Sequence, residues 1–331
     1  MQVVQGFEHI PGFHCGTTSV RSMLHFFGFE FSEPMILGLS NGLWTGYFRS
    51  DRTSPTRILM TRHGSLELDA FRNLGVQVQM RQTADPKQAL DWIRDEIDAG
   101  RPAMLQVDLA GLPFYNTSTS FAGHKIIVYG YDNDAGEVLV SDNEFDQPQT
   151  VTYEKLELAR VSPEPLFDLF NNWFEIVPPS SLTPLEIAIP RALKAQCDLM
   201  LVDTDLFGIQ AMEQFSRDLP GWVELPDWSW SARWAYQIIE KRGTGGGGFR
   251  KQYANFLDEA EPLCPDIKKY GLTERMHQIA EAWTNLALVM RDISDMPGPD
   301  FTFALPYARE IAISEADFFN TMDQVIVTSE E

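Results

Sequence analysis

Cysteine is scarce in this sequence. The 331 residues include three cysteines, Cys15, Cys197 and Cys264, and no pair has the spacing of a C-x-x-C motif or of a zinc site. A small, odd number of cysteines argues against a framework of disulfides and is typical of proteins from a reducing compartment. We therefore expect free thiols, no bound metal and no bound cofactor.

Targeting signals and long hydrophobic runs are also missing. The N-terminal residues contain no basic stretch followed by an apolar one, which is the arrangement that marks a secretory leader. No apolar run approaches the roughly 20 residues that a membrane-spanning helix needs. We therefore expect a soluble, cytoplasmic protein without a membrane span.

Positive charge is in short supply. Lysine and arginine number 26 against 47 aspartate and glutamate residues, so the formal net charge is −21 at pH 7. This surplus of negative charge disfavours nucleic acids and anionic membranes as partners. It suits a cationic substrate such as a polyamine or an amino sugar, although an acidic composition also serves solubility alone.

One basic cluster stands out from this acidic background. Four arginines fall in a short span that holds Asp51 as its single acidic residue, namely Arg49, Arg52, Arg57 and Arg62. Such a cluster can receive a phosphate group or the acidic surface of a carrier protein. The alternative is a solvated face whose arginines pair with distant carboxylates.

The chain is long enough for two domains, and its 44% of hydrophobic residues is typical of a globular protein. Residues 179–184, rich in proline and serine, interrupt all periodicity and predict a linker between domains 1–178 and 185–331. Strand and helix patterns alternate before the linker, whereas helical patterns prevail after it. The glycine run Gly243–Gly248 lacks the lysine and serine or threonine of a P-loop, which leaves a flexible joint or a phosphate cradle.

The first predicted helix begins with a cysteine. Val20, Met23, Leu24 and Phe27 recur with the spacing of one apolar helical face, and Cys15 precedes them at the predicted start of the helix. A thiol at a helix N-terminus meets backbone N–H groups and the positive end of the helix dipole, which favour the thiolate. The alternative is a buried structural cysteine.

A predicted β-hairpin supplies a partner for that cysteine. The strand that begins at His124 is followed by a turn near Asp134 and by a return strand, so residues whose numbers sum to about 268 face each other. This register predicts that His124 lies beside Asp142 and Asn143. Either side chain can hold the imidazole in one tautomer and orientation.

Other segments offer candidate substrate contacts. The glycine- and aromatic-rich segment 38–48, expected to be a loop, contributes Asn41, Trp44 and Tyr47. Asp108 and Tyr115 follow a short apolar strand and are candidates for an acceptor pocket. The alternatives are apolar packing for the loop, a strand-end turn for Asp108 and a packed ring for Tyr115.

The order cysteine, histidine, aspartate is that of papain-like cysteine enzymes, and longer signatures agree with it. Residues 8–178 resemble the N-terminal domain of the butirosin biosynthesis protein H family, on the basis of Gly12–Cys15, Ser32-Glu33, Gly38–Leu43, Asp108 with Pro113–Tyr115, and Gly123–Asp132. The rest of the chain is similar to the helical domain that accompanies it, on the basis of Ile239–Gly247, Phe249-Arg250, Tyr253 and Phe256–Ala260.

This resemblance implies an α+β, papain-like cysteine-enzyme domain with an antiparallel sheet, followed by an all-α domain. The founding member of the family transfers an acyl group from an acyl carrier protein to an amine of an aminoglycoside, in the biosynthesis of a natural product. The resemblance implies that Cys15 attacks a phosphopantetheine thioester, that His124 acts as base and that Asp142 orients His124. The implied partners are an acyl carrier protein and a small-molecule amine. The sequence leaves open whether the protein forms a homodimer. A thioesterase or peptidase of the same fold and a non-catalytic binding protein are the alternatives.

The segment before the cysteine departs from the papain-like pattern. Papain-like enzymes usually carry a glutamine there as oxyanion donor, whereas this chain offers Gln5 and His9. We therefore expect His14 or a backbone N–H to fill that role.

Overall fold

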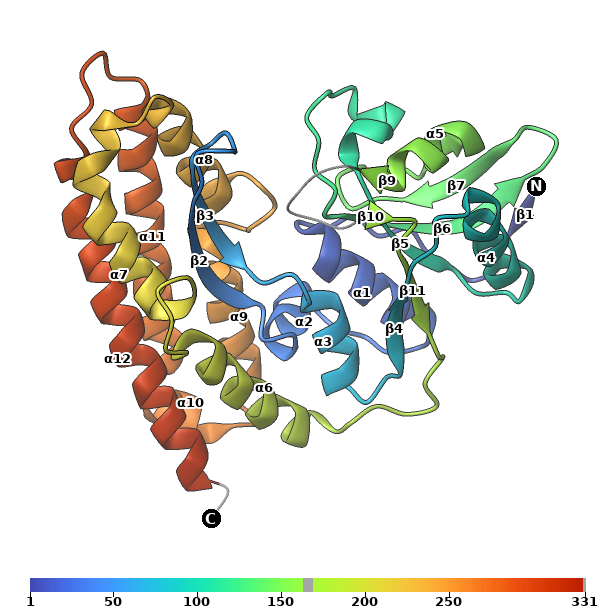
Figure 1. Cartoon of the computed structure of the whole chain (residues 1–331). Helices are drawn as coiled ribbons and strands as arrows, with labels where there is room; N and C mark the ends of the chain where they lie inside the picture. The colour runs from blue at the N-terminus through green and yellow to red at the C-terminus, as the bar shows by residue number, and fades with distance from the viewer. Residues whose placement is uncertain (163–168, 330–331) are drawn as a thin grey trace. The chain divides into compact units, whose positions relative to one another are not determined.

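The computed structural model describes residues 1–162 and 169–329 (Figure 1). The fold is mixed, with an antiparallel sheet and a helical C-terminal region, as predicted. The chain folds as two compact units, one formed by Met1–Glu33 and Gly75–Leu182 and the other by Pro34–Leu74 and Thr183–Glu331.

The first unit is built around a seven-stranded sheet in the order β4-β11-β5-β6-β7-β8, with β1 also paired to β6. Every pairing in it is antiparallel. The strands are β1 (Gln2–Val3), β4 (Val78–Arg81), β5 (Ala103–Val107), β6 (His124–Asp132), β7 (Glu137–Ser141), β8 (Gln149–Thr152) and β11 (Trp173–Ile176). A separate pair joins β9 (Val161–Ser162) to β10 (Leu169–Phe170), and the helices are α1 (Cys15–Phe26), α4 (Pro86–Asp98) and α5 (Tyr153–Ala159), with the short 3₁₀ helices η1 (Leu109–Gly111) and η2 (Pro113–Tyr115).

The central strands β5 and β6 carry the core of this unit. Alternate residues of β5 (Ala103, Leu105 and Val107) and residues of β6 such as Ile126 and Val128 pack in one cluster with Ile93 and Ile97 of α4, and all five residues of β5 are buried. Helix α1 also contacts β6 and buries Val20, Met23 and Leu24. Burial on both faces explains why these strands contain runs of consecutive hydrophobic residues, 103–105 and 126–129, rather than strict alternation.

The hairpin of β6 and β7 has the predicted register. Ile127 faces Ser141 and Val128 faces Val140, so the paired numbers sum to 268, and a bulge then shifts the pairing by one residue at Gly130. The register matters because it sets which residues meet at the open end of the hairpin, where β6 begins and β7 ends.

The second unit combines a hairpin with helices. The hairpin pairs β2 (Leu43–Arg49) with β3 (Arg57–Arg62), and α11 contacts α8, α9 and α12. In Figure 1, α7, α11 and α12 appear as long yellow, orange and red helices. The helices are α2 (Glu33–Leu39, which begins on the last residue of the first unit), α3 (Leu66–Asn73), α6 (Leu185–Met200), α7 (Gly208–Asp218), α8 (Trp228–Glu240), α9 (Arg250–Ala260), α10 (Pro265–Lys269), α11 (Leu272–Ser294) and α12 (Leu305–Ser329), with η3 (Leu219–Glu224), η4 (Gly247–Phe249) and η5 (Phe301–Phe303).

Two features of the fold go beyond the expectations from sequence. Much of the predicted loop 38–48 is strand β2, because its aromatic and β-branched residues pair with residues 57–62 and bury Leu43, Thr45 and Tyr47. Residues 34–74 are part of the second unit, whereas the predicted domains 1–178 and 185–331 are continuous in sequence. The second unit is therefore not purely helical, since it includes this hairpin.

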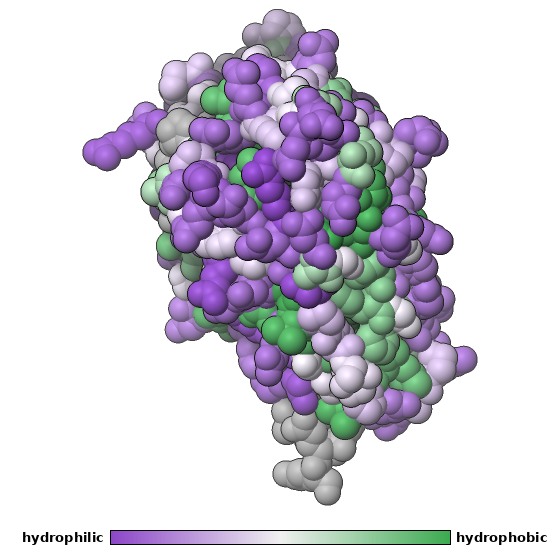
Figure 2. Space-filling model, turned by 90° about the vertical axis from the view of Figure 1, so that its right-hand side faces the viewer, coloured by the Kyte–Doolittle hydropathy of each residue, from purple (hydrophilic) through white to green (hydrophobic). Residues whose placement is uncertain are grey.

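The surface reflects the composition. The face seen in Figure 2 is largely hydrophilic, with hydrophobic side chains gathered in a band along one side. None of the helices in the described part of the chain is long and apolar enough to cross a membrane.

Candidate functional site

Cys15 is the first residue of helix α1, as predicted. His14 caps the helix with an extended backbone (φ −135°, ψ 128°), and its Nδ1 accepts a hydrogen bond of 3.2 Å from the backbone N–H of Thr17. Cys15 is buried, with 7% of its surface exposed. Its thiol therefore lies in the first turn, where backbone N–H groups have no acceptor within the helix.

His124 and Asp142 meet at the open end of the β6–β7 hairpin. His124 opens β6, Asp142 follows the last residue of β7, and both are buried. The Nε2 atom of His124 lies 2.7 Å from Oδ2 of Asp142. The predicted proximity of these two side chains is thus present in the structure.

Cys15 is the third member of this cluster. Burial alone would lower the pKa of His124, but the charges of Asp142 and Cys15, and hydrogen bonds to both side chains, raise it from 6.5 to about 10. The structure therefore brings Cys15, His124 and Asp142 together, with the imidazole charged at neutral pH.

Asn143, the alternative partner of His124, has another role. Its side-chain Nδ2 donates to the backbone carbonyl oxygen of Gly12 at 3.2 Å. Its backbone carbonyl oxygen accepts from the Gly12 N–H at 3.0 Å. Asp142 is therefore the hydrogen-bond partner of His124, while Asn143 holds the segment that leads to Cys15.

Tyr115 belongs to the same cluster. Its hydroxyl donates to Oδ1 of Asp142 at 2.9 Å and lies 3.3 Å from Nε2 of His124. Burial, followed by the charge of Asp142 and a hydrogen bond to it, raises the pKa of Tyr115 far above its ordinary value. Tyr115 therefore stays neutral and donates a hydrogen bond to the carboxylate that orients His124.

Replacing Tyr115 by phenylalanine tests this contact. We expect the Tyr115→Phe variant to lose about threefold to tenfold in the rate at which iodoacetamide alkylates Cys15 at neutral pH, since one hydrogen bond to the carboxylate beside His124 is lost. Tyr131→Phe is the matched control, because the Tyr131 hydroxyl donates to Asp98 at the surface. Equal alkylation rates in the two variants would contradict a role for Tyr115 in holding Asp142.

Asp108 does not contribute to this cluster. Its carboxylate accepts hydrogen bonds from the backbone N–H groups of Ala110 and Phe121 and from the hydroxyls of Ser120 and Ser162. Burial would raise the pKa of Asp108, but these four hydrogen bonds lower it. The residue organises the turn after β5, which corresponds to the strand-end alternative.

The side chains considered as oxyanion donors are engaged elsewhere. His9 contacts the Ser141 hydroxyl through Nδ1 and donates through Nε2 to the carbonyl oxygen of Phe145, both at 2.8 Å. Gln5 donates to the carbonyl oxygen of Val3, and His14 caps α1. The backbone N–H groups at the start of α1 are the donors that the helix itself leaves without acceptors.

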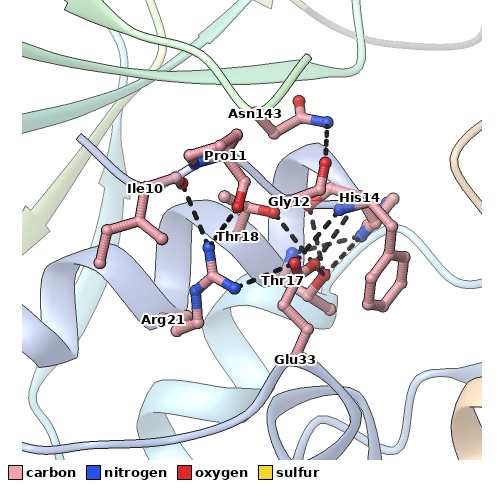
Figure 3. A network of polar contacts seen from close by, with 10 residues as sticks. Ile10, Pro11, Gly12, His14, Thr17, Thr18, Arg21, Glu33 and Asn143 are labelled. Atoms are coloured by element: carbon pink, nitrogen blue, oxygen red, sulfur yellow. Dashed lines mark hydrogen bonds and ion pairs between the residues drawn. The ribbon is translucent and has the colours of Figure 1, made fainter. Parts of the chain in front are cut away.

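Sequence patterns did not single out Glu33. Ser32-Glu33 counted only as part of the family signature, with no role for the carboxylate. In the structure the Glu33 carboxylate is buried beside the residues that precede Cys15 (Figure 3). The burial of this glutamate and its pairing with a nearby arginine mark it as a structural residue, and only the three-dimensional contacts reveal them.

Three predicted substrate-binding residues lie in the second unit. Tyr47 is buried there: its hydroxyl donates to Asp218 and accepts from Nε1 of Trp222 at 3.1 Å. Burial, then the hydrogen bond to Asp218, raises the pKa of Tyr47 far above its ordinary value. Trp44 packs on Phe207 with ring centroids 4.7 Å apart, and Asn41 follows α2 in the left-handed conformation (φ 53°). Tyr47 is therefore a core residue of this unit, as in the packing alternative.

The four arginines are also in the second unit. Arg49 and Arg57 face each other across the β2–β3 hairpin, but Arg57 is half-buried and its Nε lies 2.9 Å from Asp218. Arg62 is half-buried and donates to the carbonyl oxygen of His63. Arg49 and Arg52 are exposed and are the members of the cluster best suited to meet a partner.

Within residues 1–162 and 169–329, no three or more His, Cys, Asp or Glu side chains are grouped so as to hold a metal ion.

Comparisons with known proteins agree with the signatures in the sequence. Residues 14–143 match the family model described as butirosin biosynthesis protein H, N-terminal, and residues 154–322 match a domain of unknown function, DUF4872. No curated protein matches the sequence. The two matches follow each other and the second spans half of the chain. The chain therefore belongs to the family in which the N-terminal domain of butirosin biosynthesis protein H is followed by a DUF4872 domain.

Proposed function

We propose that this protein is a papain-like cysteine acyltransferase that moves an acyl group from a thioester through Cys15 to an amine. The observation that carries the proposal is the buried pair of His124 and Asp142, joined at 2.7 Å, with Cys15 as the further partner of His124. The family is named for a protein of butirosin biosynthesis, which supports an enzyme that makes a natural product.

The first half of the reaction forms an acyl-enzyme. The Cys15 thiolate attacks the carbonyl carbon of the donor thioester, and the new bond from sulfur to carbon replaces the bond to the donor sulfur. The imidazolium of His124 gives its proton to the departing thiolate of the donor. His124 is then neutral, and Asp142 keeps it oriented.

The second half transfers the acyl group. The nitrogen of a neutral amine attacks the acyl-enzyme, a carbon–nitrogen bond forms and the bond to the Cys15 sulfur breaks. His124 takes the proton that the amine nitrogen loses, so the products are an amide and the original pair of thiolate and imidazolium. The sum is thioester plus amine giving amide plus thiol.

Each tetrahedral intermediate carries an oxyanion, which needs hydrogen-bond donors. We assign this role to backbone N–H groups at the start of α1 other than that of Thr17, which donates to the His14 cap; the helix dipole also favours negative charge there. His9, Gln5 and His14 are less suited, because their side chains bond to other groups.

The proposed donor comes from the family resemblance, and charge suggests where it binds and which acceptor suits the protein. A phosphopantetheine thioester on an acyl carrier protein is the proposed donor, and the exposed Arg49 and Arg52 are the proposed contacts with the acidic carrier. The net charge of −21 favours a cationic amine as acceptor.

Intact-protein mass spectrometry with an acyl-pantetheine donor tests the proposal. The wild type and Cys264→Ala should gain the mass of the acyl group, whereas Cys15→Ala should gain none. Burial raises the pKa of Cys197 to about 12, so that thiol does not compete at neutral pH. If neither carrier-bound nor free thioesters label Cys15, or if Cys15→Ala is labelled like the wild type, the proposal fails.

A further inference from the structure

A single buried carboxylate gathers the groups around the start of α1. Glu33 is 5% exposed and accepts five hydrogen bonds (Figure 3). Oε1 accepts from the Phe13 N–H at 3.2 Å and from Nη1 of Arg21 at 3.2 Å. Oε2 accepts from the His14 N–H at 3.4 Å and from the hydroxyls of Thr17 and Thr18 at 2.8 and 3.0 Å.

These contacts are part of a longer arrangement that holds residues 10–14, here called the strap. Nη2 of Arg21 donates to the carbonyl oxygens of Ile10 and Pro11, at 3.1 and 2.9 Å. Asn143 binds both backbone groups of Gly12, and Glu33 binds the N–H groups of the next two residues. Every residue of the strap thus has a backbone group held by Arg21, Asn143 or Glu33.

The fit around Glu33 is close. A Cβ atom at Gly12 would overlap the Glu33 carboxylate and the Thr18 hydroxyl. Glycine therefore allows the strap to lie against the carboxylate. The two threonine hydroxyls come from the first turn of α1, so Glu33 bonds both to the strap and to the helix that carries Cys15.

We propose that Glu33 is a positioning residue that holds Cys15 in register with His124, by joining the strap to the first turn of α1. The inference rests on the proposed role of Cys15 as nucleophile. Asn143, next to Asp142 in sequence, ties the other side of the strap to the loop that orients His124. Glu33 and Asn143 together thus fix the segment that ends at Cys15.

Charge alone does not explain the arrangement. A carboxylate close to a thiolate would disfavour it, but Arg21 lies 3.2 Å from Glu33 and offsets that charge. Replacing Glu33 by glutamine removes a negative charge, and replacing Arg21 by methionine removes a positive one. An electrostatic role would therefore move the reactivity of Cys15 in opposite directions, whereas a positioning role lowers it in both variants.

The test measures the rate at which iodoacetamide alkylates Cys15 between about pH 6 and pH 9.5, followed on the Cys15 peptide by mass spectrometry. Glu33→Gln and Arg21→Met should each lower the rate at about pH 6.5 by about tenfold, because a displaced thiol loses its contact with His124. At the upper end of the range their rates should approach that of the wild type. Glu30→Gln is the matched control, since Glu30 is 78% exposed and pairs with His25 on the surface.

Thr18→Val keeps the shape of its side chain and removes one donor to Glu33, so it should give a smaller loss, about twofold, in the same direction. This variant carries the test if Glu33→Gln does not fold. A wild-type pH profile in the variants, even with a lowered melting temperature, would overturn the inference, and so would opposite shifts in Glu33→Gln and Arg21→Met. A wild-type Cys15 that itself reacts like an ordinary thiol would instead count against the proposed function.

Discussion

Replacing His124 by alanine should lower the rate of Cys15 acylation by about a thousandfold, because the variant loses both the proton donor and the charge that pairs with the thiolate. The wild type keeps the pair of Cys15 thiolate and His124 imidazolium over a wide pH range. The pKa of His124 is raised from 6.5 to about 10, so its charged form, and the stability it contributes, is fully present below pH 6.5 and is lost as the pH rises through about 10.

The pH dependence of alkylation makes this expectation measurable without a substrate. Cys15 of the wild type should react with iodoacetamide at a nearly constant rate from about pH 6.5 to pH 9. In His124→Ala the thiolate loses the charge that pairs with it, so more of the thiol is protonated at neutral pH and its rate should climb steeply over the same range. His25→Ala is the control, because His25 is a surface residue of the same helix that pairs with Glu30. Parallel profiles for all three proteins would show that His124 does not act on Cys15.

The largest effect on stability is expected from Arg250→Met in the second unit. Arg250 and Glu315 are both fully buried, and Nε of Arg250 lies 2.8 Å from Oε1 of Glu315. The guanidinium also donates to the carbonyl oxygens of Trp44 and Gly248 and to the hydroxyl of Thr45. The residue thus links helix α9 to the β2–β3 hairpin and to α12.

Removing Arg250 leaves the Glu315 charge buried without its cation. Breaking one side of such a pair costs about 3–5 kcal/mol, so the free energy of unfolding in urea should fall by about that amount. Arg275→Met is the matched control, because Arg275 of α11 pairs with Asp317, an exposed residue of α12 close to Glu315 in sequence, and such a pair contributes about 1 kcal/mol or less. Equal losses in the two variants would contradict the structural role of Arg250.

Local patterns predicted the elements whose stability is local. Helix α1, strand β5 and the β6–β7 hairpin lie where periodicity and turn residues indicate them, and the hairpin register brought His124 to Asp142. The sequence did not show whether Asp142 or Asn143 hydrogen-bonds to His124. Neighbouring side chains at a strand end point in different directions, so a shift of one position in the pairing changes which side chain meets His124.

Contacts between distant segments were not predictable from local patterns. Glu33 follows His14 by 19 positions and Phe13 by 20, and the backbone N–H groups that it binds there leave no pattern in the sequence. Strand β2 is a different case: it pairs locally with β3, but its glycine and aromatic residues suit a loop as well as a strand. Arg250 and Glu315 are 65 positions apart, so the sequence indicated only that Arg250 belongs to a family signature.

The fate of the acyl-enzyme tests the central claim most directly. The acylated wild type is isolated and its intact mass is followed with and without a primary amine. Acyl transfer predicts that loss of the acyl mass accelerates in proportion to the amine concentration and that the amide accumulates. Loss at the same rate in water alone, with the free acid as product, would contradict an acyltransferase and identify the protein as a hydrolase.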